Sequence, residues 1–146
     1  MRILRDTREK KGYWTFAGKR CKSTALKTGD YTLEGYEDVL CIERKKSCSE
    51  LAQNIVHKSR AFWRELERMQ EFEHRYLILE FTEEELGGFP WKSDLPRYIK
   101  RKIRAKGPFL ISKIIEIEEM GIKVIFAGDR DNAIKIAEDI FAEVSA

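Results

Sequence analysis

The sequence predicts a three-layer α/β domain in which helices flank a central mixed β-sheet. Residues Arg75–Phe81 form a nearly continuous apolar run, which is typical of a central strand covered on both faces. Apolar side chains recur at helical spacing from Leu51 to Met69, and again from Pro108 to Met120. The predicted order of elements, βββ-α-β-α-α-β-α, indicates layers of helices packed on a sheet.

Length and composition fit one soluble globular domain over residues 1–146. The chain has 146 residues, of which 42% are hydrophobic and 36% are charged, and this is enough for a real core. The formal net charge is only +3. Overall attraction to nucleic acid is therefore weak, and the placement of the charges matters more than their sum.

Neither a membrane span nor a zinc site is expected. Residues Met1–Asp6 contain no hydrophobic signal region, and no apolar run is long enough to cross a membrane. The three cysteines form no Cys-x-x-Cys pair, and the two histidines lie far from a zinc-ligand spacing. We expect reduced, structural thiols and a cytoplasmic protein.

The N-terminal third is predicted to be rich in β-structure. Arg2–Arg5 is a short first strand, and Tyr13–Phe16 is an aromatic, β-prone segment. Leu26–Leu33 and Asp38–Lys45 are expected to form a β-hairpin around Glu34–Glu37. The charged residues that follow the first strand are either the rim of a site or an ordinary solvated turn.

The most informative stretch is Val39–Lys45, an apolar run that ends in an acid, a guanidinium and an amine. In an extended strand Glu43 and Lys45 leave from one face and Arg44 from the other. Asp30, thirteen residues before Glu43, lies at a glycine-marked strand entry. Two carboxylates and a lysine would suit a hard cation such as Mg²⁺ and phosphodiester hydrolysis. The alternative is a surface hairpin whose charges are merely solvated.

A long amphipathic helix is predicted from an N-cap at Ser47 or Ser49 to Met69. Glu50 in its first turn favours the helix dipole, and this structural role competes with a catalytic one. Glu80, at the end of the apolar strand, is either another rim carboxylate or an edge charge.

The densest basic tract lies between Pro96 and Lys106, after a long connection over Thr82–Leu95. Six cations occur there without any acidic residue, so we predict phosphate contact rather than a solvated helix face. They are Arg97, Lys100, Arg101, Lys102, Arg104 and Lys106. The lysines scattered around Tyr13 and Trp14 are an alternative DNA surface.

The last part of the chain predicts a helix, a strand and a helix. The helix from Pro108 ends at Gly121, Ile122–Ala127 forms a strand, and the last helix runs from Gly128-Asp129 to about Glu143. The apolar residues of the last two helices are either core or an interface between subunits.

Three motifs of the chain resemble those of the XPF-type nuclease domain. Asp6-Thr7-Arg8-Glu9, Gly29-Asp30-Tyr31 and Ile42-Glu43-Arg44-Lys45 are similar to its Asp-x-Arg-Glu, Gly-Asp-Tyr and Glu-Arg-Lys motifs. Phe62–Arg68 and Tyr76–Phe81 are similar to the helix and strand that follow its catalytic strand. The resemblance covers nearly the whole chain. It implies the PD-(D/E)XK superfamily and a restriction-endonuclease-like fold, in the small phage or bacterial form.

The resemblance also implies roles for the Gly-Asp-Tyr and Glu-Arg-Lys residues. Asp30 and Glu43 would be carboxylate ligands of Mg²⁺ or Mn²⁺, with the Arg44 carbonyl completing the shell. Lys45 would position or help deprotonate the attacking water and stabilise charge in the transition state.

The remaining roles involve the acidic rim. Asp6 and Glu9 would complete it, with Arg8 either pairing them or touching the phosphate. The family has an aspartate six positions after the glutamate of Glu-Arg-Lys, where this chain has Ser49; Glu50, one residue later, is its candidate replacement.

The implied function is a metal-dependent DNA endonuclease that acts on branched, flap or junction DNA in repair, recombination or replication. The resemblance also suggests a homodimer. We expect no helix-hairpin-helix segment after the domain, so the basic tract could take over part of the DNA binding. The alternative is a catalytically inactive nuclease-fold module that binds DNA, although the acid-acid-lysine set is intact.

Overall fold

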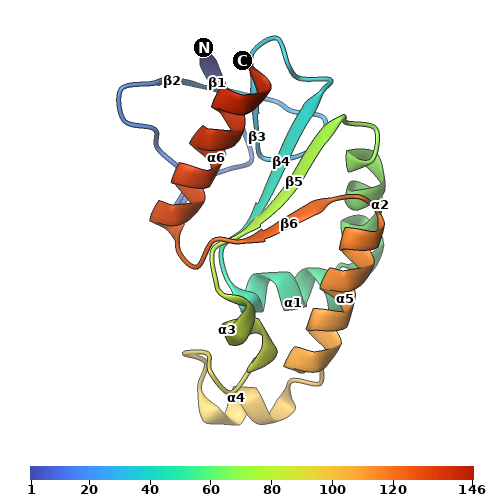
Figure 1. Cartoon of the computed structure of the whole chain (residues 1–146). Helices are drawn as coiled ribbons and strands as arrows, with labels where there is room; N and C mark the ends of the chain where they lie inside the picture. Colours follow the sequence, from blue (N-terminus) through green and yellow to red (C-terminus); the bar gives the residue numbers. More distant parts are fainter.

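A six-stranded sheet with helices on both faces organises the computed structural model, which describes all residues 1–146 (Figure 1). The strands are β1 (Arg2–Asp6), β2 (Arg20–Thr24), β3 (Tyr31–Leu33), β4 (Leu40–Lys45), β5 (His74–Leu79) and β6 (Lys123–Phe126). The helices are α1 (Cys48–Val56), α2 (Ser59–Met69), α3 (Glu83–Gly87), α4 (Arg97–Lys102), α5 (Gly107–Glu119) and α6 (Arg130–Val144).

The sheet is mixed, as predicted, and its strand order is β2-β1-β3-β4-β5-β6. The antiparallel pairs are β1 with β3 and β3 with β4, while β4, β5 and β6 run parallel to one another. Parallel strands end at the same edge of a sheet. The polar end of β4 therefore lies beside the end of β5, and the predicted fold class is confirmed.

Two hydrophobic clusters lie on opposite faces of the sheet. In β5, Leu77 and Leu79 pack in the cluster that includes α1, α2, α3 and α5, whereas Tyr76 and Ile78 pack in the cluster that includes α6. This alternation is the two-residue period of a strand buried on both faces. The second cluster also contains Trp14 and Phe16 from the loop between β1 and β2.

The long helix predicted as far as Met69 is in fact two helices, α1 and α2. The chain leaves helical geometry at Lys58, whose φ of −122° and ψ of 32° separate them. Figure 1 shows α1 and α2 running in different directions. Because Phe62 follows Ile55 by seven residues, the apolar spacing continues through the break, and no proline or glycine marks it.

The N-terminal strands also differ from the prediction. Tyr13–Phe16 is not a strand, because Trp14 and Phe16 are buried from a loop. Arg20–Thr24 instead forms β2, a largely exposed edge strand parallel to β1. Charged side chains are common on edge strands, where they discourage pairing with other chains, and here they hid the strand from the hydrophobic pattern.

The long connection after β5 contains the short helix α3. Its N-cap Thr82 and Glu85 form a capping box, in which each side chain accepts a hydrogen bond from the other residue's backbone N–H. The basic tract begins with α4, which lies with α3 at the end of the molecule opposite the two chain termini (Figure 1). None of the helices is long and apolar enough to span a membrane.

Candidate active site

The polar end of β4 presents its side chains to both faces of the sheet. Lys45 Nζ lies 3.3 Å from Glu43 Oε2 and 5.3 Å from the centre of the Phe62 ring, so this pair faces α2. Arg44 lies on the other face, with its guanidinium 5.4 Å from the centre of the Trp14 ring. The predicted division of the three side chains between the faces is thus seen in the structure.

Asp30 is fixed between β1 and β4 by main-chain hydrogen bonds. Its N–H donates to Ile42 O and its carbonyl accepts from Asp6 N, both at 2.8 Å. Its carboxylate accepts from Arg44 N at 2.9 Å. The preceding Gly29 has a φ of 87°, and a Cβ there would lie 2.6 Å from Cys41 Sγ. Only glycine allows this close approach, which explains the Gly-Asp pair.

Asp30 and Glu43 form a pair of neighbouring carboxyl groups, and the charge of each acts on the other. Burial, and then the nearby charge of Asp30, raise the pKa of Glu43 well above its ordinary value. Burial also raises the pKa of Asp30, against the effect of its hydrogen bonds. Two neighbouring buried carboxylates repel each other, so without a cation the pair favours holding a proton.

Lys45 supplies the positive charge beside this pair. Its side chain is only 10% exposed. Burial acts to lower the pKa of Lys45, but the charges of Glu43 and Asp30 outweigh it and raise the pKa. Glu65, half-buried on α2, adds a negative charge that acts on all three groups. Sequence reasoning did not place Glu65 in the site.

Arg44 is held in a buried ionic network that the sequence did not predict. Its side chain is 1% exposed, and Nε lies 2.8 Å from Glu9 Oε1. Its Nη1 donates to Glu80 Oε2 at 3.0 Å, and Trp14 Nε1 donates to the same oxygen at 2.9 Å. The guanidinium is therefore committed to protein carboxylates, while its backbone N–H holds Asp30.

Asp6 has a structural environment rather than an open one. Its Oδ2 accepts from Arg8 Nε at 2.6 Å, and its Oδ1 accepts from Leu26 N at 2.9 Å. Burial would raise the pKa of Asp6, but these bonds lower it overall. Asp6 thus links the end of β1 to the loop after β2, and Arg8 is exposed beside it.

Glu50 also has a structural contact. Its Oε1 accepts from Lys46 N at 2.8 Å, and its own N–H donates to the N-cap Ser47. These bonds close the turn between β4 and α1. Glu50 nevertheless borders the same cavity as the motif residues.

One cavity of about 370 Å³ gathers all but one of the predicted catalytic residues and has no hydrophobic lining. It is lined by Arg8, Glu9, Lys10, Lys11, Asp30, Glu43, Arg44, Lys45, Lys46 and Glu50. Asp6, which lies outside this lining, is the exception. Burial, followed by the charge of Asp30, raises the pKa of Glu9. The cavity thus combines acidic groups with an unusual proton affinity and several surrounding cations.

A hard divalent cation fits the acidic pair. Glu43 Oε1 is buried and lacks a hydrogen-bond partner. Such an atom costs free energy unless a ligand satisfies it. Carboxylate and carbonyl oxygens are the donors that Mg²⁺ and Mn²⁺ prefer. No cluster of three or more His, Cys, Asp or Glu side chains is placed to hold a metal ion, so the Asp30–Glu43 pair would need main-chain or water oxygens to complete a shell.

The predicted DNA-binding residues lie apart from this cavity, on α4 and the segment after it. Lys100 Nζ donates to Trp91 O at 3.2 Å, and Lys106 Nζ lies 5.3 Å from the centre of the Trp91 ring. None of the six cations of the tract forms an ion pair. The tract therefore carries positive charge that no acidic side chain neutralises.

Comparisons with known proteins agree with the motifs. The ERCC4 domain family matches residues 5–139. Among solved structures, XPF from Aeropyrum pernix superposes with a TM-score of 0.70 at 18% identity, covering 99% of this chain and 65% of that one. The same protein in complex with DNA gives 0.69, at 18% identity, over 99% and 64%. The chain thus spans about two thirds of those structures. No curated protein sequence matches.

Proposed function

Because the chain belongs to the ERCC4 domain family, we propose that it is a metal-dependent DNA endonuclease. The family match confirms the resemblance to XPF-type nuclease domains, and it supports a DNA nuclease as the general function. We further propose that residues 1–146 form one nuclease domain that hydrolyses DNA. The dependence on a metal and the branched or junction substrate also belong to this proposal. The observation that carries it is the Asp30–Glu43 pair beside Lys45.

Asp30 and Glu43, with the main-chain carbonyl of Arg44, would hold Mg²⁺ or Mn²⁺. A bound divalent cation polarises a phosphodiester and lowers the pKa of bound water. The chain's contribution is position: Gly29 and the bond from Arg44 N to Asp30 fix one carboxylate, and β4 fixes the other. Both carboxylates are thus placed before the substrate arrives.

Lys45 acts in this proposal as a fixed positive charge. Despite burial, the neighbouring carboxylates raise its pKa, so the amine stays protonated at neutral pH. A protonated amine is a poor base, but it can orient a nucleophile and stabilise the negative charge that develops on the phosphate. We therefore favour charge stabilisation over proton abstraction by Lys45.

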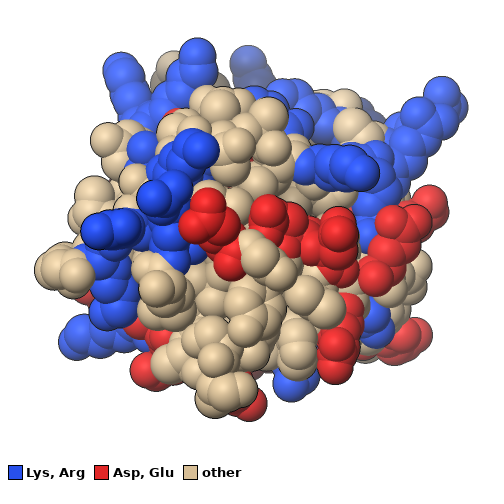
Figure 2. Space-filling model, turned by 90° about the horizontal axis from the view of Figure 1, so that it is seen from above, with Lys and Arg blue, Asp and Glu red and all other residues tan.

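The DNA backbone is proposed to lie along the basic tract. The end of the molecule that carries the chain termini is the less favourable surface, because a row of acidic side chains crosses it between groups of Lys and Arg (Figure 2). The tract lies at the opposite end, with α4 (Figure 1). When Lys and Arg side chains bind DNA phosphates, counterions are released, and this release favours binding.

A homodimer remains part of the proposal, but most of the apolar residues predicted for its interface are core. Leu110, Ile114 and Ile117 of α5 pack in one hydrophobic cluster, and Ile140 and Phe141 of α6 in the other. An interface between subunits would have to use the exposed residues of α5, Phe109 and Ile115, or other surfaces. Sedimentation of the purified chain measures its oligomeric state directly.

Cleavage of defined DNA tests the proposal. The protein is incubated with flap, fork, nicked and linear duplex DNA in Mg²⁺ or Mn²⁺, with EDTA as the control. We expect cleavage that needs the metal and favours flap or fork DNA over linear duplex. Failure to cut any of the four substrates, with protein in excess, would contradict an endonuclease.

The second candidate function is DNA binding without catalysis. The unpaired cations of the basic tract would serve either function. A gel shift that persists in EDTA, together with no cleavage in Mg²⁺, would favour this candidate. The Glu43→Gln variant separates the two, because it changes cleavage only if the wild-type site is active.

A further inference from the structure

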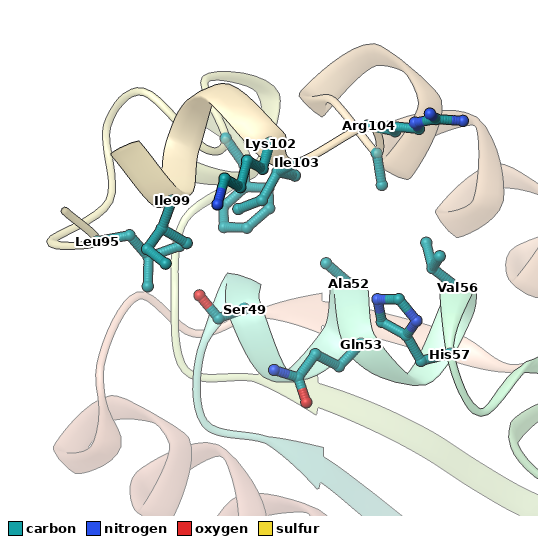
Figure 3. Close-up of a pocket in the computed structure, with 12 residues that line it drawn as sticks. Ser49, Ala52, Gln53, Val56, His57, Leu95, Ile99, Lys102, Ile103 and Arg104 are labelled. Atoms are coloured by element: carbon teal, nitrogen blue, oxygen red, sulfur yellow. The ribbon is translucent and has the colours of Figure 1, made fainter. Parts of the chain in front are cut away.

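A second cavity, of about 440 Å³, lies between α1 and the segment that contains α4 (Figure 3). Its size is that of a small-molecule site. Its walls are mainly apolar: they include Val56 from α1, and Ile99 and Ile103 from α4 and its C-cap. Figure 3 shows the Val56 and Ile99 side chains directed toward the space between these helices.

The polar groups of this cavity favour an anionic ligand. Two cations, Lys102 and Arg104, line it, and no acidic side chain does. Neither cation forms an ion pair. Lys102 extends from α4 across the cavity mouth in Figure 3, and Ser49 and Gln53 of α1 lie on the other side. An apolar slot with a cationic rim suits a planar base that carries a phosphate.

A further hollow, of about 430 Å³, lies between this cavity and the carboxylate site, and its lining includes both acids and lysines. It shares Lys46 with the site cavity. It shares Ser49, Phe89 and Leu95 with the apolar cavity. A flexible polymer that occupied the site could therefore continue into the apolar cavity, whereas a free small molecule would need no such path.

Exposed aromatic rings lie in the same part of the chain. Trp91 is 55% exposed and Tyr98 is 65% exposed, and both are close in sequence to Leu95, which lines the cavity. The Lys106 ammonium lies over the Trp91 ring. Exposed aromatics together with cations are characteristic of surfaces that stack the bases of single-stranded nucleic acid.

We propose that the apolar cavity binds an unpaired nucleotide of the DNA, with the base against its apolar lining, which includes Val56 and Ile99, and the phosphate at Lys102. A base within a duplex is paired and stacked, so only a single-stranded segment can enter the cavity. The inference rests on the proposed function and deepens it, because it gives a physical reason for choosing DNA with a single-strand/double-strand junction.

Binding measured in EDTA tests this inference separately from cleavage. The probes are a blunt fluorescent duplex, the same duplex with a thymidine overhang of about five nucleotides, and that overhang with abasic residues. Stacking of one base supports an affinity gain of roughly fivefold or more, so the thymidine overhang should bind more tightly than the other two probes by about this factor. An abasic overhang that binds equally well would overturn the proposal.

Two matched pairs of variants locate the binding. Val56→Asp places a negative charge in the cavity, whereas Ile115→Asp makes the same change at an exposed position of α5 outside it. Val56→Asp should abolish the preference for the overhang and Ile115→Asp should retain it. Lys102→Ala should reduce that preference more than Lys100→Ala, which removes the same charge from α4 outside the lining.

The outcomes separate this inference from the proposed function. If the two variants of each pair changed the preference for the overhang equally, the cavity would not bind a nucleotide, even if the protein cleaves DNA in Mg²⁺. A preference for the overhang that depends on Val56 and Lys102, without cleavage, would support the cavity and contradict the endonuclease. If Val56→Asp instead altered only the oligomeric state, the cavity would belong to a contact between copies of the chain.

Discussion

The carboxylate site and the basic tract hold their charges in opposite ways. In the site, Arg44 is 1% exposed and contacts Glu9 and Glu80, while Lys45 contacts Glu43. In the tract, Lys102 and Arg104 are exposed and form no ion pair. The first arrangement holds each cation against a defined acidic partner, and the second leaves positive charge free to attract phosphate.

This difference has an energetic consequence. Buried ion pairs gain little stability overall, but removing one partner leaves an uncompensated charge in a low-dielectric surrounding. An exposed cation loses little when it is removed, because water already solvates it. Changes in the site should therefore affect catalysis and stability, whereas changes in the tract should affect binding and its dependence on salt.

Removing one carboxylate ligand should have the largest effect. Asp30→Asn and Glu43→Gln keep the side-chain shape but remove a negative charge, so cleavage should fall by about 10³-fold. DNA binding should persist or strengthen, since repulsion of the phosphates falls. Single-turnover cleavage and a binding titration measure the two quantities. Near-normal cleavage by Glu43→Gln would show that the site is elsewhere.

Lys45→Ala and Glu50→Gln sharpen the assignment within the cavity. Lys45→Ala should abolish turnover and leave metal affinity largely unchanged, because the amine holds no metal. Glu50 bonds Lys46 N. A loss of cleavage in Glu50→Gln without loss of stability would indicate that this acid replaces the family's aspartate, and full activity would assign it to the turn alone.

The buried network around Arg44 should dominate stability. Glu80→Ala removes the acceptor of both Arg44 Nη1 and Trp14 Nε1. The free energy of unfolding should fall by about 3 kcal/mol or more, because the guanidinium stays buried with one partner fewer. Lys100→Ala is the surface control and should change it by less than about 0.5 kcal/mol. Urea unfolding of both variants measures the contrast.

Similar losses of stability in Glu80→Ala and Lys100→Ala would contradict the contrast drawn above. Glu80→Gln offers a further check, since the amide oxygen can still accept from Trp14 while the charge partner of Arg44 is lost. An intermediate stability for Glu80→Gln would apportion the effect between the hydrogen bonds and the charge.

The sequence could predict the part of the site that is local. Glu43 and Lys45 share a strand, so the two-residue period places them together, and Gly29 marks the tight approach that sets Asp30. The contact between Glu80 and Trp14 joins residues 66 positions apart, and nothing in either local pattern indicates it. The sequence consequently left Glu80 open as a rim acid or an edge charge.

For the fold too, local features were predictable from the sequence and long-range ones were not. The buried strand β5 and the helices α5 and α6 were predicted because their periodicity is strong and local. The break at Lys58 was missed because the apolar spacing runs through it unchanged. The break allows α1 and α2 to pack against the sheet in different directions. The residues next to Lys58 carry no local signal of this tertiary constraint.

The contribution of the basic tract to DNA binding should be measurable from the dependence of affinity on salt concentration. Replacing Lys100, Arg101 and Arg104 with alanine should flatten the slope of log K against log[salt] by about 2.7, at about 0.9 for each phosphate contact in duplex DNA. Affinity should fall similarly for all sequences, because phosphate contacts carry no base information. Cleavage at saturating DNA should be nearly unchanged. An unaltered slope would move the DNA surface to the lysines near Tyr13.

Metal binding and pH should act together on the stability of the site. The pKa of Glu43 is raised in the folded protein, by burial and then by Asp30, so the folded state binds more protons than the unfolded chain above the ordinary pKa of 4.5. Stability of the metal-free protein should therefore fall as the pH rises from there through the folded pKa. A divalent cation replaces the proton, and its stabilising effect should grow over the same pH range.

Thermal unfolding in EDTA and in Mg²⁺ at about pH 5.5 and about pH 8 measures this coupling. A cation at about one hundred times its Kd adds about 2.7 kcal/mol, or roughly 5 to 10 °C in Tm for a domain of this size, at the higher pH. The increment should be smaller at the lower pH, where protons compete for the carboxylates. Glu43→Gln should lose both the increment and the dependence on pH, whereas Lys100→Ala, in the basic tract, should retain both. A metal effect equal in Glu43→Gln and the wild type would place the cation outside the Asp30–Glu43 pair.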